Sequence, residues 1–161
     1  MSDDRVTTYL SYALAAAHRA IHADLSRRLK DEGVQVEAWR IMEAIDAERT
    51  ITMGHLAEKV LLAPPTLSKM VDRMVADGLV QRQIAPQDLR QVHLVLSAYG
   101  QSIRDRLRRV AQDHETALLA SLGADRAAAL HAMLMDLVDL ASPTDRQAEP
   151  PPAGQGAARL I

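Results

Sequence analysis

The sequence predicts a mainly α protein that carries one small β hairpin, and three observations support this fold class. Apolar residues recur at helical spacing along most of the 161-residue chain. Two short segments near the middle alternate apolar and polar residues, as half-buried strands do. Phe is absent and aromatic residues make up 2% of a chain that is 48% apolar, a composition that favours helices over a β sandwich.

The first predicted element is a long amphipathic helix from Val6 to Leu29. Its apolar stripe comprises Val6, Leu10, Leu14, Ala17, Ile21, Leu25 and Leu29. Gly33 follows at a place where a left-handed residue ends a helix. A second helix is expected from Val36 to Ala47.

The middle of the chain predicts a strand and two further helices. The β-branched residues at 50–52 are long enough for one edge strand, and Thr52 can cap a short helix over 53–60. Two prolines preset the first turn of the next helix, which runs from Pro64 to Asp77. Gly78 ends it.

A hairpin and two helices complete the predicted order. Val80 to Ala85 and Val92 to Leu96 are the strands, joined by a polar turn from Pro86 to Gln91. Ser97 can cap a long helix that ends near Leu122. A last helix runs from residue 124 or 125 to Ala141.

This order joins a helix-turn-helix to a β wing between long flanking helices, so the fold class is mainly α with an α+β wing. We expect one unit over 1–141, in which 34–96 form the winged-helix lobe. The flanking segments 5–30 and 98–141 carry more apolar surface than one chain can bury, which predicts a homodimer. The Pro- and Gly-rich residues 142–161 are expected to be a disordered tail.

Composition excludes several classes of function. The net charge of −2 counts against nucleic-acid coating through bulk positive charge, so any DNA contact must come from local patches. The chain has no Cys, which rules out disulfides and thiol-based sensing. The polar N-terminus is unlike a signal peptide and no apolar run has membrane-spanning length, so we expect a cytoplasmic protein.

Catalytic and metal-binding patterns are weak. The sequence holds no nucleophile elbow, no Gly-rich phosphate loop and no Cys nucleophile. His18 and His22 are one turn apart on a helix and could form half of a metal site, but no further ligand is fixed, which favours packing or solvent roles. We therefore expect no enzyme, no metal and no cofactor.

Several stretches together resemble the MarR (multiple antibiotic resistance regulator) family across roughly Leu10 to Leu140. These are GVQVEAWRIMEAI, ITMGHLAEKV, APPTLSKMVDRMVADGLVQR and APQDLRQVHLVLSAYG. The resemblance implies a ligand-responsive transcriptional repressor that binds double-stranded DNA. The chain departs from the family pattern at Gln35 and Ala63, which are poorer helix caps than Ser or Thr, and at Gln91 in the wing.

Residues that could contact DNA lie on the helix Pro64 to Asp77 and on the wing. The outer face of this helix is expected to present Thr66, Ser68, Lys69 and Arg73. The resemblance places Arg90 in the minor groove, with Asp72 and Asp88 as acids that orient the wing. For Asp72 a surface carboxylate without a significant partner is an equal alternative. Because local charge is low, basic residues of the flanking helices must contribute, such as Arg27, Arg28, Arg104, Arg108 or Arg109.

Two further expectations concern ligands and partners. Tyr9, Trp39 and Met42 are candidates to line a pocket for a small aromatic or amphipathic anion, although Trp and Met at helical spacing more often belong to a core. The expected function is a sequence-specific, dimeric regulator on an inverted-repeat operator. The alternative is a helical dimeric protein-interaction module that has lost DNA binding.

Overall fold

The computed structural model describes residues 5–85 and 88–141, without the side chains of 85 and 88–91. The predicted tail at 142–161 lies outside the described residues. The chain divides into two compact units, Met1–Thr116 and Ala117–Ile161, and each is described by itself.

The N-terminal helix begins later than the sequence predicted. A short 3-10 helix, η1 (Arg5–Thr8), precedes α1 (Leu10–Lys30), and Tyr9 between them has an extended backbone with φ −76° and ψ 137°. The apolar spacing could not reveal this break, because a 3-10 turn places residues three apart on one face much as an α-helix does. In α1 only Leu25 and Leu29, near its C-terminal end, are buried.

The helix-turn-helix elements match their predicted ranges closely. They are α2 (Val36–Glu48), β1 (Ile51–Thr52), α3 (Met53–Val60) and α4 (Pro64–Ala76). The predicted cap at Thr52 is confirmed, since its Oγ1 accepts a hydrogen bond from the N–H of His55 at 3.3 Å. Gly78 has a positive φ of 73°, in agreement with its predicted role after α4.

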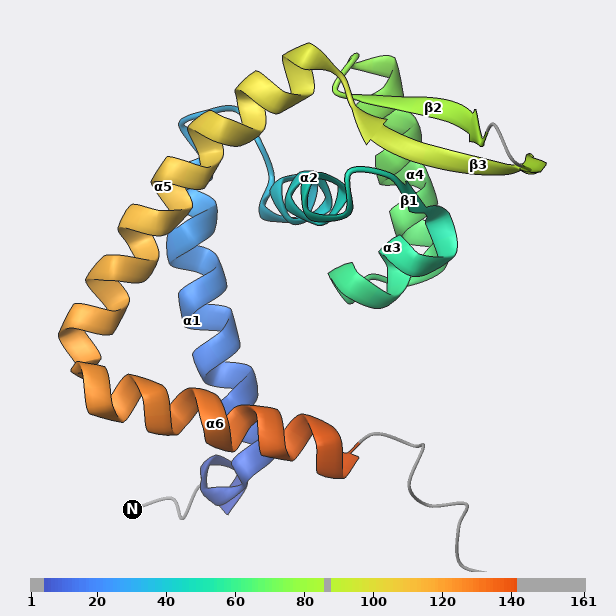
Figure 1. Cartoon of the computed structure of the whole chain (residues 1–161). Coiled ribbons are helices and arrows are strands. Elements are labelled where there is room, and N and C mark those ends of the chain that lie inside the picture. The colour runs from blue at the N-terminus through green and yellow to red at the C-terminus, as the bar shows by residue number, and fades with distance from the viewer. Residues whose placement is uncertain (1–4, 86–87, 142–161) are drawn as a thin grey trace, which may run out of the picture. The chain divides into compact units, whose positions relative to one another are not determined.

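The sheet is small and antiparallel, with strand order β1-β3-β2. β2 spans Val80–Ala85 and β3 spans Asp88–Leu96, so the two strands form the hairpin that Figure 1 shows running side by side. The predicted turn from Pro86 to Gln91 is too long, because pairing resumes at Asp88 opposite Ala85 after a register shift. Strand pairing is made by backbone groups and tolerates polar residues on a hairpin arm.

The core of the first unit gathers side chains from α1 to α5, where α5 spans Ala98–Leu122. Its largest fully buried members are Leu29, Ile41, Met42, Ile45, Ile51, Leu56, Leu67, Leu94 and Leu107. One continuous core therefore fixes α4 and the hairpin relative to α2 and the first part of α5.

The second unit contains the end of α5 and α6 (Ala124–Ala141), separated by Gly123 with φ 87°. No residue of α6 is buried. Its apolar side chains Leu130, Met133 and Val138 are exposed by 43%, 56% and 55%. Among the described helices none is long and apolar enough to cross a membrane.

Candidate nucleic-acid interface

Helix α4 has one buried face and one outer face. Leu67, Val71 and Met74 are buried and hold the helix against the core. The four predicted DNA-binding side chains of this helix, Thr66, Ser68, Lys69 and Arg73, are all exposed. The helix therefore presents two hydroxyls and two cations to solvent, and their contact with DNA stays a prediction.

The start of α4 explains why a poor cap is tolerated there. Ala63 occupies the N-cap position with an extended backbone and makes no side-chain cap hydrogen bond. Pro64 and Pro65 fill the first two helical positions and have no N–H, so a serine at 63 would have had few donors to accept from. Thr66 supplies the one first-turn N–H that remains, a group suited to a phosphate oxygen.

The turn between α3 and α4 depends on a leucine in an unusual conformation. Leu61 has φ 54° and ψ 38°, in the left-handed region that favours glycine, and its side chain is 90% exposed. Both features cost free energy. The position is therefore a strained and exposed turn shortly before α4.

An ion pair joins α4 to the hairpin. The carboxylate of Asp72 lies 2.5 Å from Nη2 of Arg82 on β2, and both side chains are about half exposed. Asp72 thus has a wing arginine as partner, although the sequence analysis considered Arg90 and did not single out Arg82. The side chains of Arg90 and Asp88 lie outside the described part of the chain, so their roles stay predictions.

Lys69 and Arg73 carry the positive charge of the outer face. Lys69 makes no ion pair with a described residue, and Arg73 lies 3.7 Å from Asp77 in an exposed i,i+4 pair. Exposed pairs of this kind contribute little free energy and exchange readily with a phosphate.

The base of the hairpin is fixed by the segment Leu96 to Gly100. Ser97 donates its hydroxyl to the carbonyl of Gly78 at 2.6 Å and accepts from the N–H of Gly100 at 2.8 Å, which confirms it as the cap of α5. A Cβ on Gly100 would lie 2.0 Å from the carbonyl oxygen of Leu79. The Leu-Ser-x-x-Gly spacing therefore joins the end of α4, the first wing strand and α5 at one point.

Comparisons with known proteins match this architecture. The family model described as "MarR family" matches residues 35–92, from the start of α2 into β3. A MarR family transcriptional regulator from Silicibacter pomeroyi is 28% identical, with a TM-score of 0.75 over 85% of this chain and 98% of that one. The winged-helix lobe of this chain is thus similar to the MarR family.

Two repressors are also similar to this chain over most of their length. The transcriptional repressor CouR, solved bound to a 23-mer DNA duplex, is 24% identical with a TM-score of 0.78, covering 86% of this chain and 98% of that one. The homoprotocatechuate degradative operon repressor of Escherichia coli is 24% identical over 81% of this chain and 88% of the relative. The predicted winged-helix fold is confirmed.

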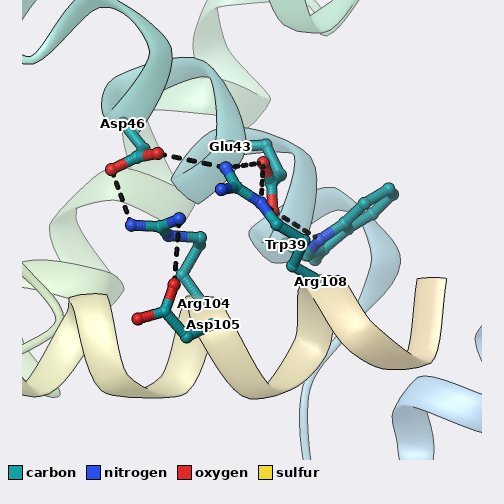
Figure 2. Close-up of polar contacts among 6 residues, drawn as sticks. All are labelled: Trp39, Glu43, Asp46, Arg104, Asp105 and Arg108. Carbon is teal, nitrogen blue, oxygen red and sulfur yellow. Dashed lines mark hydrogen bonds and ion pairs between the residues drawn. The ribbon is translucent and has the colours of Figure 1, made fainter. Parts of the chain in front are cut away.

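In this winged-helix lobe a cluster of charged side chains joins α2 to α5 (Figure 2). Arg108 contacts Glu43 at 2.5 and 3.1 Å and Asp46 at 3.0 Å. Arg104, which is only 7% exposed, contacts Asp46 at 2.7 Å and Asp105 at 3.0 Å. We call Glu43, Asp46, Arg104 and Arg108 the α2–α5 clamp.

The carboxylates of the clamp stabilise the positive charge of Arg108. Hydrogen bonds that the Arg108 guanidinium donates to the Glu43 carboxylate hold the pKa of Arg108 above its ordinary value, against the opposing effect of partial burial. Bidentate contacts between arginine and carboxylate are directional as well as strong. The clamp therefore holds the first part of α5 against α2.

Two of the five flanking arginines suggested for DNA contact are bound to acids within the lobe. Arg104 and Arg108 lie in the clamp, and arginine charge that is neutralised inside the protein is not free for phosphate. Arg27 and Arg28 form exposed pairs with Asp24 at 2.5 and 3.2 Å, which exchange readily with a phosphate, so their contribution stays a prediction. Of the five suggested arginines, Arg109 alone makes no ion pair with a described residue.

The three candidate pocket residues are placed differently. Trp39 lines two neighbouring hollows, of about 510 and 320 Å³, and its Nε1 donates to Glu43 at 3.2 Å. Met42 is fully buried in the core, and Tyr9 is 62% exposed. Neither of them lines the two hollows beside Trp39.

The candidate half metal site is not extended by other ligands. The rings of His18 and His22 stack with centroids 5.5 Å apart, and His22 Nε2 lies 3.4 Å from Glu37. Within residues 5–84 and 92–141, no group of three His, Asp or Glu side chains is placed to hold a metal ion.

Sequence reasoning missed the clamp and Arg82, but it had partial signals. Glu43 and Asp46 are three apart on α2, and Arg104 and Arg108 are four apart on α5, so each pair shares a helix face. Two acids on one helix and two arginines on another are compatible with ion pairs between the two helices. Only the fold shows that the two faces meet.

Proposed function

We propose that this protein is a member of the MarR family and a sequence-specific DNA-binding transcriptional regulator, a repressor that acts in the cytoplasm and has no catalytic activity. The observation that carries the proposal is the outer face of α4, where Lys69 and Arg73 are exposed beside a hairpin anchored at Ser97. A helix of this kind enters the major groove, and a wing contacts the adjacent backbone or minor groove. CouR, a repressor of the same fold, was solved on a DNA duplex, which supports this reading.

The regulator acts as a homodimer on an inverted repeat. The exposed apolar residues of α6, together with Leu10, Leu14 and Ile21 of α1, provide the surface that a second copy would cover. Two-fold symmetry then places half-sites about 10 bp apart. Light scattering at micromolar concentration tests the dimer, and one subunit's mass would contradict it.

The DNA contacts are tested by binding curves on operator and scrambled DNA at several salt concentrations. Arg73→Ala should weaken binding to all sequences and flatten the salt slope by about one unit, since it contacts phosphate. Arg90→Ala should reduce the preference for A·T-rich flanks. The matched control is Arg126→Ala, an exposed arginine of α6. If the wild-type protein binds no DNA in a genome-wide selection, a protein-interaction module becomes the better function.

The second part of the proposal is ligand response. The hollows beside Trp39 are of a size that suits a small organic molecule, and an aromatic or amphipathic anion bound there lowers DNA affinity. A ligand shifts the population only by its difference in affinity for the two states. Titration of aromatic carboxylates against a preformed protein–DNA complex tests this part.

A further inference from the structure

The inner face of the hairpin carries apolar side chains beyond the point where the core covers it. Val80, Arg82 and Ile84 alternate along β2 and therefore share this face. Val80 and its partner Leu96 are buried, at the base of the hairpin. Further along, Ile84 and its partner Val92 are 62% and 43% exposed. We call Ile84 and Val92 the wing pair.

The wing pair adjoins the outer face of α4. Arg82, one step closer to the core on the same face of β2, contacts Asp72 of α4. Asp72 follows the exposed Lys69 by three positions, so both lie on the same side of the helix. Figure 1 shows the far end of the hairpin extending past α4. A continuous surface therefore runs from Lys69 through the ion pair to Ile84.

The wing pair is too small to hold a protein partner by itself. A stable protein interface takes about 800 Å² from each partner, and two side chains supply a small fraction of that area. Among hairpin residues 80–84 and 92–96, no other large apolar side chain is exposed. The pair can therefore only supplement a larger interface, and the surface that adjoins it is the outer face of α4.

DNA bound to that face offers apolar surface beside the hairpin. The backbone strand between a major groove and the adjacent minor groove has phosphates on the outside and deoxyribose C–H groups along the minor groove. Apolar side chains such as Ile contact DNA from the minor-groove side in several protein families. A contact of this kind neutralises no phosphate and releases no counterions, so salt does not weaken it.

This protein has a reason to use such a contact. Its net charge is −2, and Arg104 and Arg108 are bound to acids in the clamp. Few cations of the lobe are thus free for phosphate. Affinity that does not depend on charge would offset this shortage.

We propose that the wing pair packs against deoxyribose rings of one DNA strand, at the edge of the minor groove next to α4. The inference rests on the DNA binding proposed above and adds an apolar contact to the charged ones. Ile84 is the larger and more exposed member of the pair, so it supplies most of the contact.

The test uses the full-length protein on an operator found by genome-wide selection. Binding curves at several salt concentrations are combined with hydroxyl-radical footprinting, which measures the exposure of individual deoxyribose rings. Ile84→Ala should bind about tenfold more weakly with an unchanged salt slope, since it removes apolar area and no charge. At saturating protein, sugars that the wild-type protein protects beside each half-site should become exposed.

Three further variants separate the contact from other effects. Gln83→Ala is the matched control, because Gln83 is the exposed neighbour on the opposite face of the same strand, and it should bind as wild type does. Ile84→Val keeps an apolar β-branched side chain and should retain affinity within about threefold. Ile84→Thr keeps the β-branched shape without most of the apolar surface, and it decides the question if alanine disturbs the strand.

Each outcome supports or overturns the proposal. Unchanged affinity and sugar protection in Ile84→Ala and Ile84→Thr overturn it. Equal losses in Gln83→Ala also overturn it, because the whole hairpin and not one face would then be responsible. A wild-type protein that selects no DNA contradicts the proposed function and this inference together, whereas operator binding that is insensitive to Ile84 contradicts only the inference.

Discussion

Arg104 of α5 and Asp46 of α2, which are 58 positions apart in the sequence, meet through a 2.7 Å hydrogen bond between Nη2 and Oδ1. The arginine side chain is 9% exposed and the aspartate side chain 29% exposed. A guanidinium so far from solvent needs its acid, because removal of one partner leaves an uncompensated charge.

Asp46→Ala should therefore destabilise the protein by about 3 kcal/mol, as is typical when a buried pair loses one member. The matched control is Asp105→Ala, which removes a second acid from the same arginine. Asp105 is 57% exposed and should cost less than about 1 kcal/mol. Urea unfolding of both variants measures the difference, and equal losses would contradict a special role for Asp46.

Gly100→Ala should cost about 2 to 3 kcal/mol, since its Cβ would lie 2.0 Å from the backbone oxygen of Leu79 and the backbone cannot move cheaply. Gly54→Ala serves as the opposite case. No atom lies within 4 Å of its Cβ, so the helix α3 should gain about 0.5 to 1 kcal/mol. Thermal unfolding tests both, and a tolerated alanine at position 100 would show that the hairpin base adapts.

Leu61→Gly should raise stability by up to about 1 kcal/mol. The left-handed backbone costs leucine about 1 to 2 kcal/mol, while glycine adds about 0.5 to 1 kcal/mol of entropy loss on folding. Leu61→Ala keeps the strain and removes an already exposed side chain, so it should change stability little. If alanine stabilises as much as glycine does, exposure of the leucine and not its backbone is the costly feature.

Glu48 gives a prediction for acid stability. A hydrogen bond from Lys59 at 2.7 Å holds the pKa of Glu48 below its ordinary value, and the charge of Lys59 adds to the effect. The folded state therefore binds fewer protons than the unfolded state near pH 4, so this contribution is present above the ordinary pKa and disappears as pH falls through the folded one. Glu48→Gln should flatten the acid limb of a stability–pH curve, which urea unfolding at a series of pH values measures.

Features that depend on neighbouring residues could be predicted from the sequence. Thr52 and Ser97 cap helices because a hydroxyl at the N-cap reaches an amide two or three residues on. Gly78 and Gly123 follow helices because their backbones adopt a positive φ. These are local requirements, and a short stretch of sequence contains them in full.

Features that join distant segments could not be predicted in the same way. Asp72 was recognised as a possible wing contact, but its partner Arg82 is decided by the register of β2 beside α4. The sequence alone indicates surface cations at Arg104 and Arg108, because their carboxylate partners lie on another helix. The length of β3 was underestimated for a related reason, since Asp, Arg and Gln resemble turn residues until a partner strand is known.

Helix α6 has no buried residue, and its apolar side chains would be covered only in the proposed dimer. The concentration of dimer then depends on the square of the monomer concentration. Halving expression lowers the active fraction as well as the total, so the response to gene dosage is steeper than proportional near the dissociation constant. In a cell with one copy of the gene, a small change in expression would thus change the active fraction, which does not happen for a monomeric regulator.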